Sequence, residues 1–440
     1  MKLNKLTTWI FLALVLGVVV GYACNLAAPD AKAAKEIAAY FSVLADIFLR
    51  MVKMIIAPLV FATLVAGITS VGDGKAVGRI GIKALGWFVT ASFVSLLLGF
   101  CFAHLLHPGL SMHLPLPEVG VVTNLKTASL NFKTFIVNIF PKSIVEAMSG
   151  NEVLQIVIFS LFFGFALNTV KGTARDLIVD IVNGLVHVMI KVTDYVMLAA
   201  PLGVFAAVAA AITVQGLAVL STYAALVSSF YVGLASLWLV LIAAGYFFLK
   251  KRVFRLLGLI KEPILIAFST ASSEAAYPKT LEQLDKFGVK REVSGFVLPM
   301  GYAFNLDGSM MYQAFAMIFI IHAYGIEMSL STQFIMLLVL MVSSKGMAGV
   351  SRASLVVVAA TLPLFGLPES ALLLIMGIDV FLDMGRTATN VVGNSLATAI
   401  IAKWEGKLGP ETPEKDVARE SLGQRLPGET ARSRESTLVS

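Results

Sequence analysis

The sequence predicts an all-α protein that crosses a lipid membrane several times. Of its 440 residues, 58% are hydrophobic and only 14% are charged, whereas a typical soluble domain has about 25% charged residues. The hydrophobic residues form long runs rather than the alternating pattern of a membrane β-barrel. Both observations exclude a water-soluble globular protein and favour a bundle of membrane-spanning helices. The net charge of +7 does not indicate nucleic-acid binding, because basic residues gather in the cytoplasmic loops of membrane proteins.

A series of apolar segments defines the expected course of the chain. One crossing needs about 20 residues, and several segments are longer, so they must tilt, bend or double back. In order, the segments are 8–27, 40–71, 79–106, 130–171, 176–213, 221–250, 253–291, 293–324, 331–367 and 371–404. The last part of the chain, residues 409–440, combines prolines, mixed charges and few apolar residues. We expect this part to be a disordered cytoplasmic tail.

The basic residues indicate how the segments are oriented. With the N-terminus in the cytoplasm, successive crossings bring the following basic clusters to the cytoplasmic side. They are residues 2–5, 75–83, 171–175 and 251–261. The next cluster, 279–291, would lie outside if segment 253–291 crossed once, against the positive-inside rule. We therefore expect 253–291 to be a re-entrant hairpin with its tip near 269–276, and both chain termini to be cytoplasmic.

A second re-entrant hairpin is expected at 331–367, because the same count places both of its ends outside the cell. Its middle is rich in serine and glycine and contains Lys345, and Arg352 follows; these two residues either reach the outer surface or add to the field of a binding site. Serine pairs mark both tips, Ser272-Ser273 and Ser343-Ser344. Opposed repeats of broken helices that meet in mid-membrane are typical of secondary transporters.

The last apolar segment carries the polar residues from which we infer a substrate site. At 100° per residue, one stripe contains Asp379, Asp383, Arg386, Thr387, Asn390 and Asn394. Each charge at a helix centre costs at least about 2.5–3.5 kcal/mol. A guanidinium binds a carboxylate with two hydrogen bonds, and a carboxylate can receive an ammonium group. Arg386 and Asp383 therefore suggest an acidic amino acid, and a purely structural ion pair is the alternative.

The preceding span suggests a cation site. Asn305 and Asp307 lie about 200° apart on a regular helix, so they face one site only if the helix unwinds, which Gly301 and Gly308 permit. Unwound carbonyls with Asn and Asp oxygens bind hard cations; a glycine-kinked helix is the alternative. Near the hairpin tips, serine hydroxyls and helix N-termini would attract a carboxylate, or the serines would bond only to their own helices.

Together, these motifs resemble the dicarboxylate/amino acid:cation symporter family, which includes the glutamate transporter homologues. The matching pieces are Ser272-Ser273, Asn305-Leu-Asp307-Gly308, residues 343–350 and the pattern Asp379-x3-Asp383-x2-Arg386-Thr387-x2-Asn390, within residues 5–408. The resemblance implies a homotrimer with eight transmembrane helices, two hairpins and an elevator mechanism. It also implies a scaffold, residues 1–71 and 108–220, and a moving transport domain, residues 72–107 and 221–408.

By motif matching, the resemblance also implies the binding residues. Substrate would contact Ser272, Ser273, Asp383, Arg386, Thr387 and Asn390, and the backbone of Met347, Ala348 and Gly349. Coupling cations or their support would involve Ser92, Gly301, Asn305, Asp307, Asp379, Asn390 and Asn394. No cofactor and no metal site other than a possible Na+ site is implied, because the coupling ion is H+ or Na+.

Several positions depart from the sodium-coupled members of the family. Those members carry an acid where Asn394 stands, and Tyr and Thr where Phe88 and Ala91 stand, whereas Ser92 matches. The loss of one charge and two oxygen donors weakens a cation site and favours proton coupling, although the third-span Glu of proton-coupled relatives is also missing. In the second hairpin, Ser351-Arg352 replaces the usual Pro-Gly.

We therefore expect a symporter for glutamate and aspartate in a plasma membrane, driven by a proton or sodium gradient. The absence of a glycosylation sequon favours a bacterial inner membrane. A C4-dicarboxylate symporter of the same family is the close alternative, but those members lack the acid at Asp383 and the hydroxyl at Thr387. An ion channel would need a continuous polar pore. An enzyme would need a nucleophile–base or metal constellation, which we do not find in the sequence.

Overall fold

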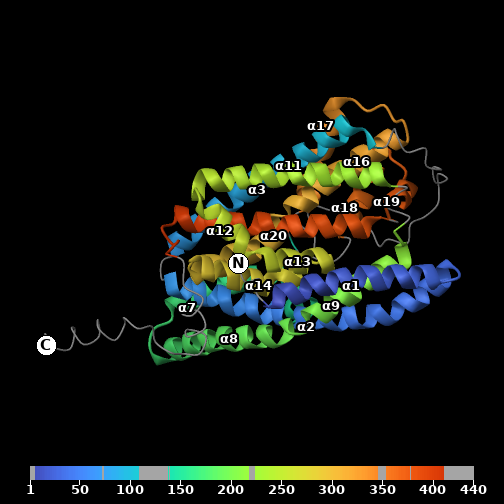
Figure 1. Ribbon diagram of the computed structural model, residues 1–440. Coiled ribbons are helices and arrows are strands. Elements are labelled where there is room, and N and C mark those ends of the chain that lie inside the picture. Colours follow the sequence, from blue (N-terminus) through green and yellow to red (C-terminus); the bar gives the residue numbers. More distant parts are fainter. Residues whose placement is uncertain are drawn as a thin grey trace, which may run out of the picture.

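The computed structural model is a bundle of helices (Figure 1), and it describes residues 5–71, 74–108, 137, 139–217, 223–344, 353–376 and 378–410. The α-helices are α1 (Lys5–Ala27), α2 (Ala31–Val71), α3 (Gly74–Leu106), α6 (Ile144–Gly150), α7 (Val153–Thr169), α8 (Thr173–Met197), α9 (Ala200–Gln215), α11 (Ala224–Leu249), α12 (Arg252–Leu259), α13 (Lys261–Thr270), α14 (Ser273–Phe287), α15 (Arg291–Phe304), α16 (Asp307–Ala323), α17 (Leu330–Ser343), α18 (Ala353–Thr361), α19 (Leu373–Met376) and α20 (Asp379–Trp404). Two 3-10 helices, η2 (Leu362–Phe365) and η3 (Glu369–Leu372), follow α18. The predicted all-helical class is confirmed.

Several helices are long and apolar enough to cross a bilayer. Among the described residues there are five such spans, in α1, α2, α3, α11 and the α15–α16 pair, and a sixth if α8 and α9 count as one. The segment expected at 176–213 is bent by 52° between α8 and α9, where Pro201 starts the second helix. Helix α7 has only 17 residues, and α20 contains three buried charges. The predicted count of eight crossings therefore stays a prediction.

Some helix boundaries differ from the sequence prediction for local reasons. Helix α2 begins at Ala31, ahead of the expected start at residue 40, because Asp30 Oδ1 accepts a hydrogen bond from the backbone N–H of Ala33 (2.7 Å). The last segment starts irregularly, through η3 and α19, and becomes a long helix only at Asp379. The tail beyond residue 410 lies outside the described residues.

The helices pack in two groups. Helices α1, α2, α7, α8 and α9 contact one another in the lower part of Figure 1, and α3, α11, α16, α18 and α20 lie above them. Helices α13, α14 and α15 lie between, because each touches α20 as well as α2 or α9. Small residues permit the closest approach: a Cβ added at Gly17 of α1 would lie 2.8 Å from the carbonyl oxygen of Phe205 on α9.

The first predicted hairpin is formed by α13 and α14. The turn between them is at Ala271, inside the expected tip of 269–276, and Ala271 has the left-handed φ of 47°. The N–H of Ser272 closes the end of α13 by donating to the carbonyl of Ala267 (3.3 Å). The hairpin begins at Lys261 and not at residue 253, because α12 is a separate helix.

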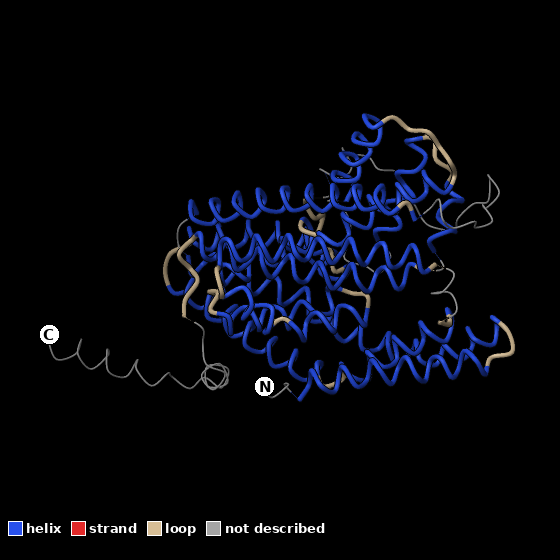
Figure 2. Tube along the Cα trace, turned by 45° about the horizontal axis from the view of Figure 1, so that its top comes forward, coloured by secondary structure: helices blue, strands red, loops and turns tan. Residues whose placement is uncertain are grey.

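A second predicted irregularity lies between α15 and α16. Helix α15 ends at Phe304, Asn305 and Leu306 are non-helical, and α16 begins at Asp307. The expected unwinding is therefore present. In Figure 2, most loops lie at the ends of the bundle, but a few short ones interrupt its interior. Because these breaks expose backbone N–H and C=O groups inside the protein, they create polar binding positions away from water.

The second predicted hairpin is only partly visible. Helices α17 and α18 contact each other, and Ser344 Oγ, at the end of α17, donates to the carbonyl of Met341 (2.9 Å). The tip that follows, residues 345–352, lies outside the described residues. The predictions for Lys345, Ser351, Arg352 and the Met347–Gly349 backbone fall in that tip.

Candidate functional site

The polar stripe of α20 faces the interior of the protein. Asp379, Asp383 and Arg386 are 0%, 1% and 3% exposed, and the remaining stripe residues are also buried. Helix α20 is surrounded by α11, α13, α15 and α16, so none of these side chains is turned toward lipid. Burial of two acids and one base is costly unless each charge has a partner, and the partners therefore define the site.

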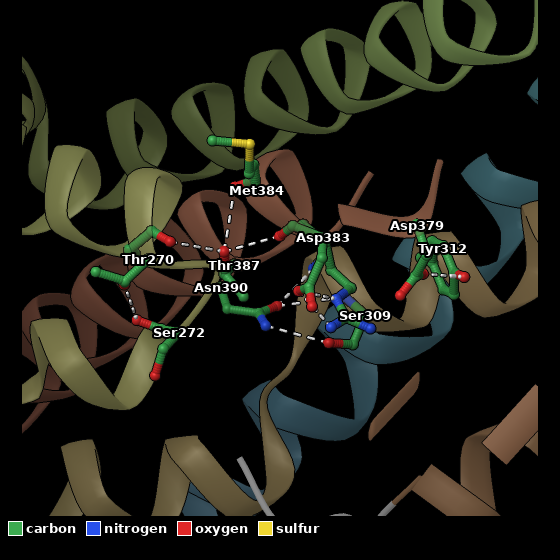
Figure 3. A network of polar contacts seen from close by, with 12 residues as sticks. Thr270, Ser272, Ser309, Tyr312, Asp379, Asp383, Met384, Thr387 and Asn390 are labelled. Carbon is green, nitrogen blue, oxygen red and sulfur yellow. Dashed lines mark hydrogen bonds and ion pairs between the residues drawn. The ribbon is translucent and has the colours of Figure 1, made fainter. Parts of the chain in front are cut away.

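Arg386 and Asp383 form an ion pair one helical turn apart. The Arg386 Nε and Nη2 groups both donate to Asp383 Oδ1, the former at 3.0 Å. The guanidinium carbon also lies 5.2 Å from the ring centre of Tyr312 on α16. The Tyr312 hydroxyl donates to Asp379 Oδ1 at 2.6 Å, as Figure 3 shows. The arginine is thus held between two elements of the bundle.

One nitrogen of this arginine has no protein partner within the described part of the chain. The Nη1 group of Arg386 is buried and has no hydrogen-bond partner among the described residues. An unsatisfied N–H of a buried charged group costs free energy. A ligand carboxylate that reached Nη1 would remove this cost, so the arrangement differs from a closed structural pair.

Thr387 and Asn390 join α20 to its neighbours. Thr387 Oγ1 lies 2.8 Å from the carbonyl oxygen of Asp383 and 3.0 Å from that of Ala267 on α13. Asn390 Oδ1 accepts from the backbone N–H groups of Gly308 (2.9 Å) and Ser309 (3.3 Å). It thereby caps the N-terminus of α16. Both predicted substrate residues thus hold the hairpin and α16 against the arginine-bearing helix.

The tip of the first hairpin carries the two predicted serines. Ser272 Oγ accepts from the N–H of Ala275 (3.3 Å) and so caps α14. Ser273 is also buried. In Figure 3, Ser272 lies on the hairpin side of the polar network and Asp379 on the other side, with Thr387 and Asn390 between them. The network therefore extends from the hairpin tip across α20 to α16.

Four of the residues predicted for the cation site are brought together, namely Gly301, Asn305, Asp307 and Asn394, whereas Asp379 lies apart from them and pairs with Tyr312. Asn305 Nδ2 lies 3.1 Å from Asp307 Oδ2 and 3.2 Å from Asn394 Oδ1. A Cβ added at Gly301 would lie 2.3 Å from Asn394 Oδ1. Asn305 Oδ1 is buried and has no hydrogen-bond partner among the described residues. One carboxylate and several amide oxygens form a set that fits a hard monovalent cation.

One of the third-span residues, Phe88, lies beside this cluster. Phe88 is buried, and its Cζ is 3.6 Å from the position of a Cβ at Gly301. Ser92 is fully buried one helical turn further along α3. The phenyl ring of Phe88, which has no hydroxyl group to offer a cation, thus lies against the cluster. Of Gly301, Asn305, Asp307 and Asn394, only Asp307 carries a full negative charge.

Three residues that matter here were not predicted. On α16, Tyr312 hydrogen-bonds to Asp379, and Ser309 accepts from Asn390. On α20, Gly393 leaves space for the carboxylate of Asp307, because a Cβ there would lie 1.8 Å from Asp307 Oδ2. Tyr312 and Ser309 are polar residues in a largely apolar segment, a signal that sequence analysis could have used. Gly393 has no such signal, since its role depends on a residue of another helix.

The sequence is similar to those of known membrane transport proteins. The sequence model of the sodium:dicarboxylate symporter family matches residues 6–404. A proton/sodium-glutamate symport protein of Bacillus caldotenax is 38% identical over 416 residues, which are 93% of this chain and 96% of the relative. A proton/glutamate-aspartate symporter of Escherichia coli K12 is 39% identical over 369 residues (82% and 84%).

Relatives with a different substrate are almost as similar. A C4-dicarboxylate transport protein of Pseudomonas syringae pv. syringae is 36% identical over 418 residues, which cover 93% of this chain and 90% of the relative. The family match extends over nearly the whole chain, and several of its helices are long and apolar enough to span a bilayer. The protein is therefore a multi-pass membrane protein that belongs to the sodium:dicarboxylate symporter family.

Proposed function

We propose that the protein is a secondary active symporter that takes up L-glutamate and L-aspartate with protons or sodium ions. The observation that carries this proposal is the buried Asp383–Arg386 pair, in which Arg386 Nη1 has no hydrogen-bond partner among the described residues. The similarity to glutamate and glutamate-aspartate symporters supports the same substrate class. A bacterial inner membrane is the proposed location, and transport rather than catalysis is the proposed activity.

An acidic amino acid fits the pair because it carries both a carboxylate and an ammonium group, and can therefore give each of the two buried side chains a new partner of opposite charge. Its side-chain carboxylate would bind Arg386, and its ammonium group would bind Asp383, so both buried charges would stay paired. The α-carboxylate would then face the hairpin tips, where Ser272 and Ser273 lie at the start of α14. Binding therefore exchanges one set of ion pairs for another and avoids leaving a lone charge in the interior.

A C4-dicarboxylate is the second candidate, because transporters of this class are also similar to the chain. Its first carboxylate would bind Arg386 as well as an amino acid does. The rest of the molecule offers no cation for Asp383, which would then lose its ion pair with Arg386 while buried at 1% exposure. The acid at position 383 therefore favours the amino acid.

The coupling ion would bind at the cluster of Asn305, Asp307 and Asn394, with the Gly301 and Asn390 carbonyls and Ser92 as further candidates. Asn390 connects this cluster to the substrate residues, since its side chain holds the start of α16. A cation at Asp307 would therefore stabilise the same backbone break that positions the substrate site. This connection gives a physical route for coupling.

Movement by an elevator step is the proposed mechanism of translocation. In this proposal, α1, α2, α7, α8 and α9 form the scaffold, and α3 with α11–α20 forms the transport domain of each protomer of a homotrimer. The division of the helices into two packing groups is compatible with it. The hairpin helices α13 and α14 lie at the boundary between the groups, where a moving domain would slide.

Uptake into proteoliposomes tests the proposed function. We expect accumulation of labelled glutamate and aspartate above the outside concentration when a proton or a sodium gradient is imposed alone. Labelled succinate should accumulate less. If none of the three compounds accumulates with either gradient, or if transport only equalises concentrations, the proposal is wrong.

Replacing Asp383 with Asn tests the role of the carboxylate. The amide cannot pair with the substrate ammonium, and a charged hydrogen bond contributes about 1.5–3 kcal/mol. Glutamate uptake should therefore fall roughly tenfold to a hundredfold, while any succinate uptake falls less, because Arg386 becomes available to it. The control is Asp180→Asn, the same change at an exposed position of α8. Equal losses for both substrates would count against the assignment.

Replacing Gly393 with Ala tests the cation cluster. The added Cβ would lie 1.8 Å from Asp307 Oδ2, and overpacking of this kind typically costs about 1–3 kcal/mol. The apparent affinity for the coupling ion, measured from the dependence of uptake on Na+ concentration and on pH, should fall at least fivefold. Gly86→Ala is the control, because nothing lies within 4 Å of its Cβ. Unchanged ion dependence in a folded Gly393→Ala protein would refute the site.

A further inference from the structure

A basic cavity lies at one end of the bundle, where α11 and α12 meet the C-terminal end of α20. Its volume is about 140 Å³, and it is lined by Leu249, Arg252, Lys403, Gly406 and Leu408. The volume exceeds that of several water molecules, which is enough for a phosphate group. Two of the five lining residues are cations and none is an acid, so the cavity is suited to an anion.

Lys403 has hydrogen-bonding capacity left for such an anion. Its ammonium group donates to the carbonyl of Phe248, but an ammonium has three N–H groups. Within the described part of the chain, no carboxylate lies within ion-pair distance of it. Arg252 is held in place, because its Nη2 donates to the carbonyls of Phe287 (3.0 Å) and Gly409 (3.1 Å). The lysine is thus the adaptable cation and the arginine the fixed one.

Two acids, Glu405 and Glu292, are paired with cations that do not line the cavity. Glu405 binds Arg79 (2.7 Å) and Lys83 (2.6 Å) of α3, and hydrogen bonding from Arg79 lowers the pKa of its carboxyl group. Glu292 binds Lys407 at 2.6 Å. Two further exposed cations, Lys250 and Lys251, lie in the sequence between the lining residues Leu249 and Arg252. Among the described residues, the charge near the cavity is therefore positive.

The surroundings of the cavity are those of a membrane interface. Trp87, Phe248 and Trp404 form a cluster with ring centres 5.2–5.9 Å apart, and tryptophans concentrate at the level of lipid headgroups. Phe247 and Phe254 are exposed beside the cavity, at 68% and 60%. A molecule in the cavity would thus have its charged part near the cations and an apolar part beside these rings.

We propose that this cavity binds the phosphate group of an anionic phospholipid, with Lys403 and Arg252 as the phosphate ligands. Leu249 and Leu408 would contact the glycerol part of the same lipid. Basic pockets between transmembrane helices bind anionic headgroups in this way. The site lies at the C-terminal end of α20, the helix that carries the ion pair, so a bound lipid would hold that helix at the membrane surface.

Lipid titration of the purified full-length protein tests this site. Phosphatidylglycerol and phosphatidylcholine are added separately to protein in detergent, and bound lipid is counted by mass spectrometry of the intact protein. The wild type should prefer phosphatidylglycerol. A basic residue near the membrane surface contributes about 1 kcal/mol, so Lys403→Gln should weaken phosphatidylglycerol binding about fivefold, and Lys403→Arg should restore it.

The control is Lys261→Gln, which removes the same charge from an exposed position at the start of α13. This helix directly follows α12, and Lys261 does not line the cavity. The control variant should leave phosphatidylglycerol binding unchanged. Equal binding of the two lipids, or equal losses in the Lys403 and Lys261 variants, would overturn the proposal. A parallel titration with inorganic phosphate distinguishes the source. Displacement of phosphatidylglycerol by phosphate at low millimolar concentration would assign the cavity to a soluble anion and overturn the lipid assignment.

Discussion

The buried ion pair between Asp383 and Arg386 is the interaction around which the candidate site is built. Both residues lie inside the bundle at 1% and 3% exposure, where removal from water costs several kcal/mol per charge. A buried pair of this kind contributes little to stability, since an apolar pair of similar size often does as well. Its presence, with one arginine nitrogen left without a partner among the described residues, is better explained by binding of a charged substrate than by folding.

The broken helices around the pair follow from the same constraint. A regular helix uses all of its interior backbone groups, whereas the ends of α14 and α16 present N–H groups inside the protein. Ser272 accepts from the N–H of Ala275, and Asn390 accepts from the N–H groups of Gly308 and Ser309, so these N–H groups are satisfied. The caps come from residues that also define the predicted substrate site. Binding and the stability of the breaks are therefore linked through the same side chains.

Much of this arrangement could be predicted because it depends on local patterns. The unwinding at Asn305 followed from two polar residues two positions apart between glycines, and the hairpin turn followed from the spacing of basic clusters. Tyr312 could not be assigned in the same way, because its partner Asp379 is 67 residues away in the sequence. The apolar runs likewise did not indicate that α12 is a separate helix, or that the segment expected at 176–213 bends just before Pro201.

The most direct test of the account is an electron cryo-microscopy structure of the full-length protein with bound aspartate in a lipid bilayer. The account predicts ligand density between the hairpin tips and α20, with the ligand carboxylate on the Arg386 guanidinium, its ammonium on Asp383, and the direct contact between these two side chains broken. Ligand density elsewhere, with Asp383 and Arg386 still bound to each other, would contradict it.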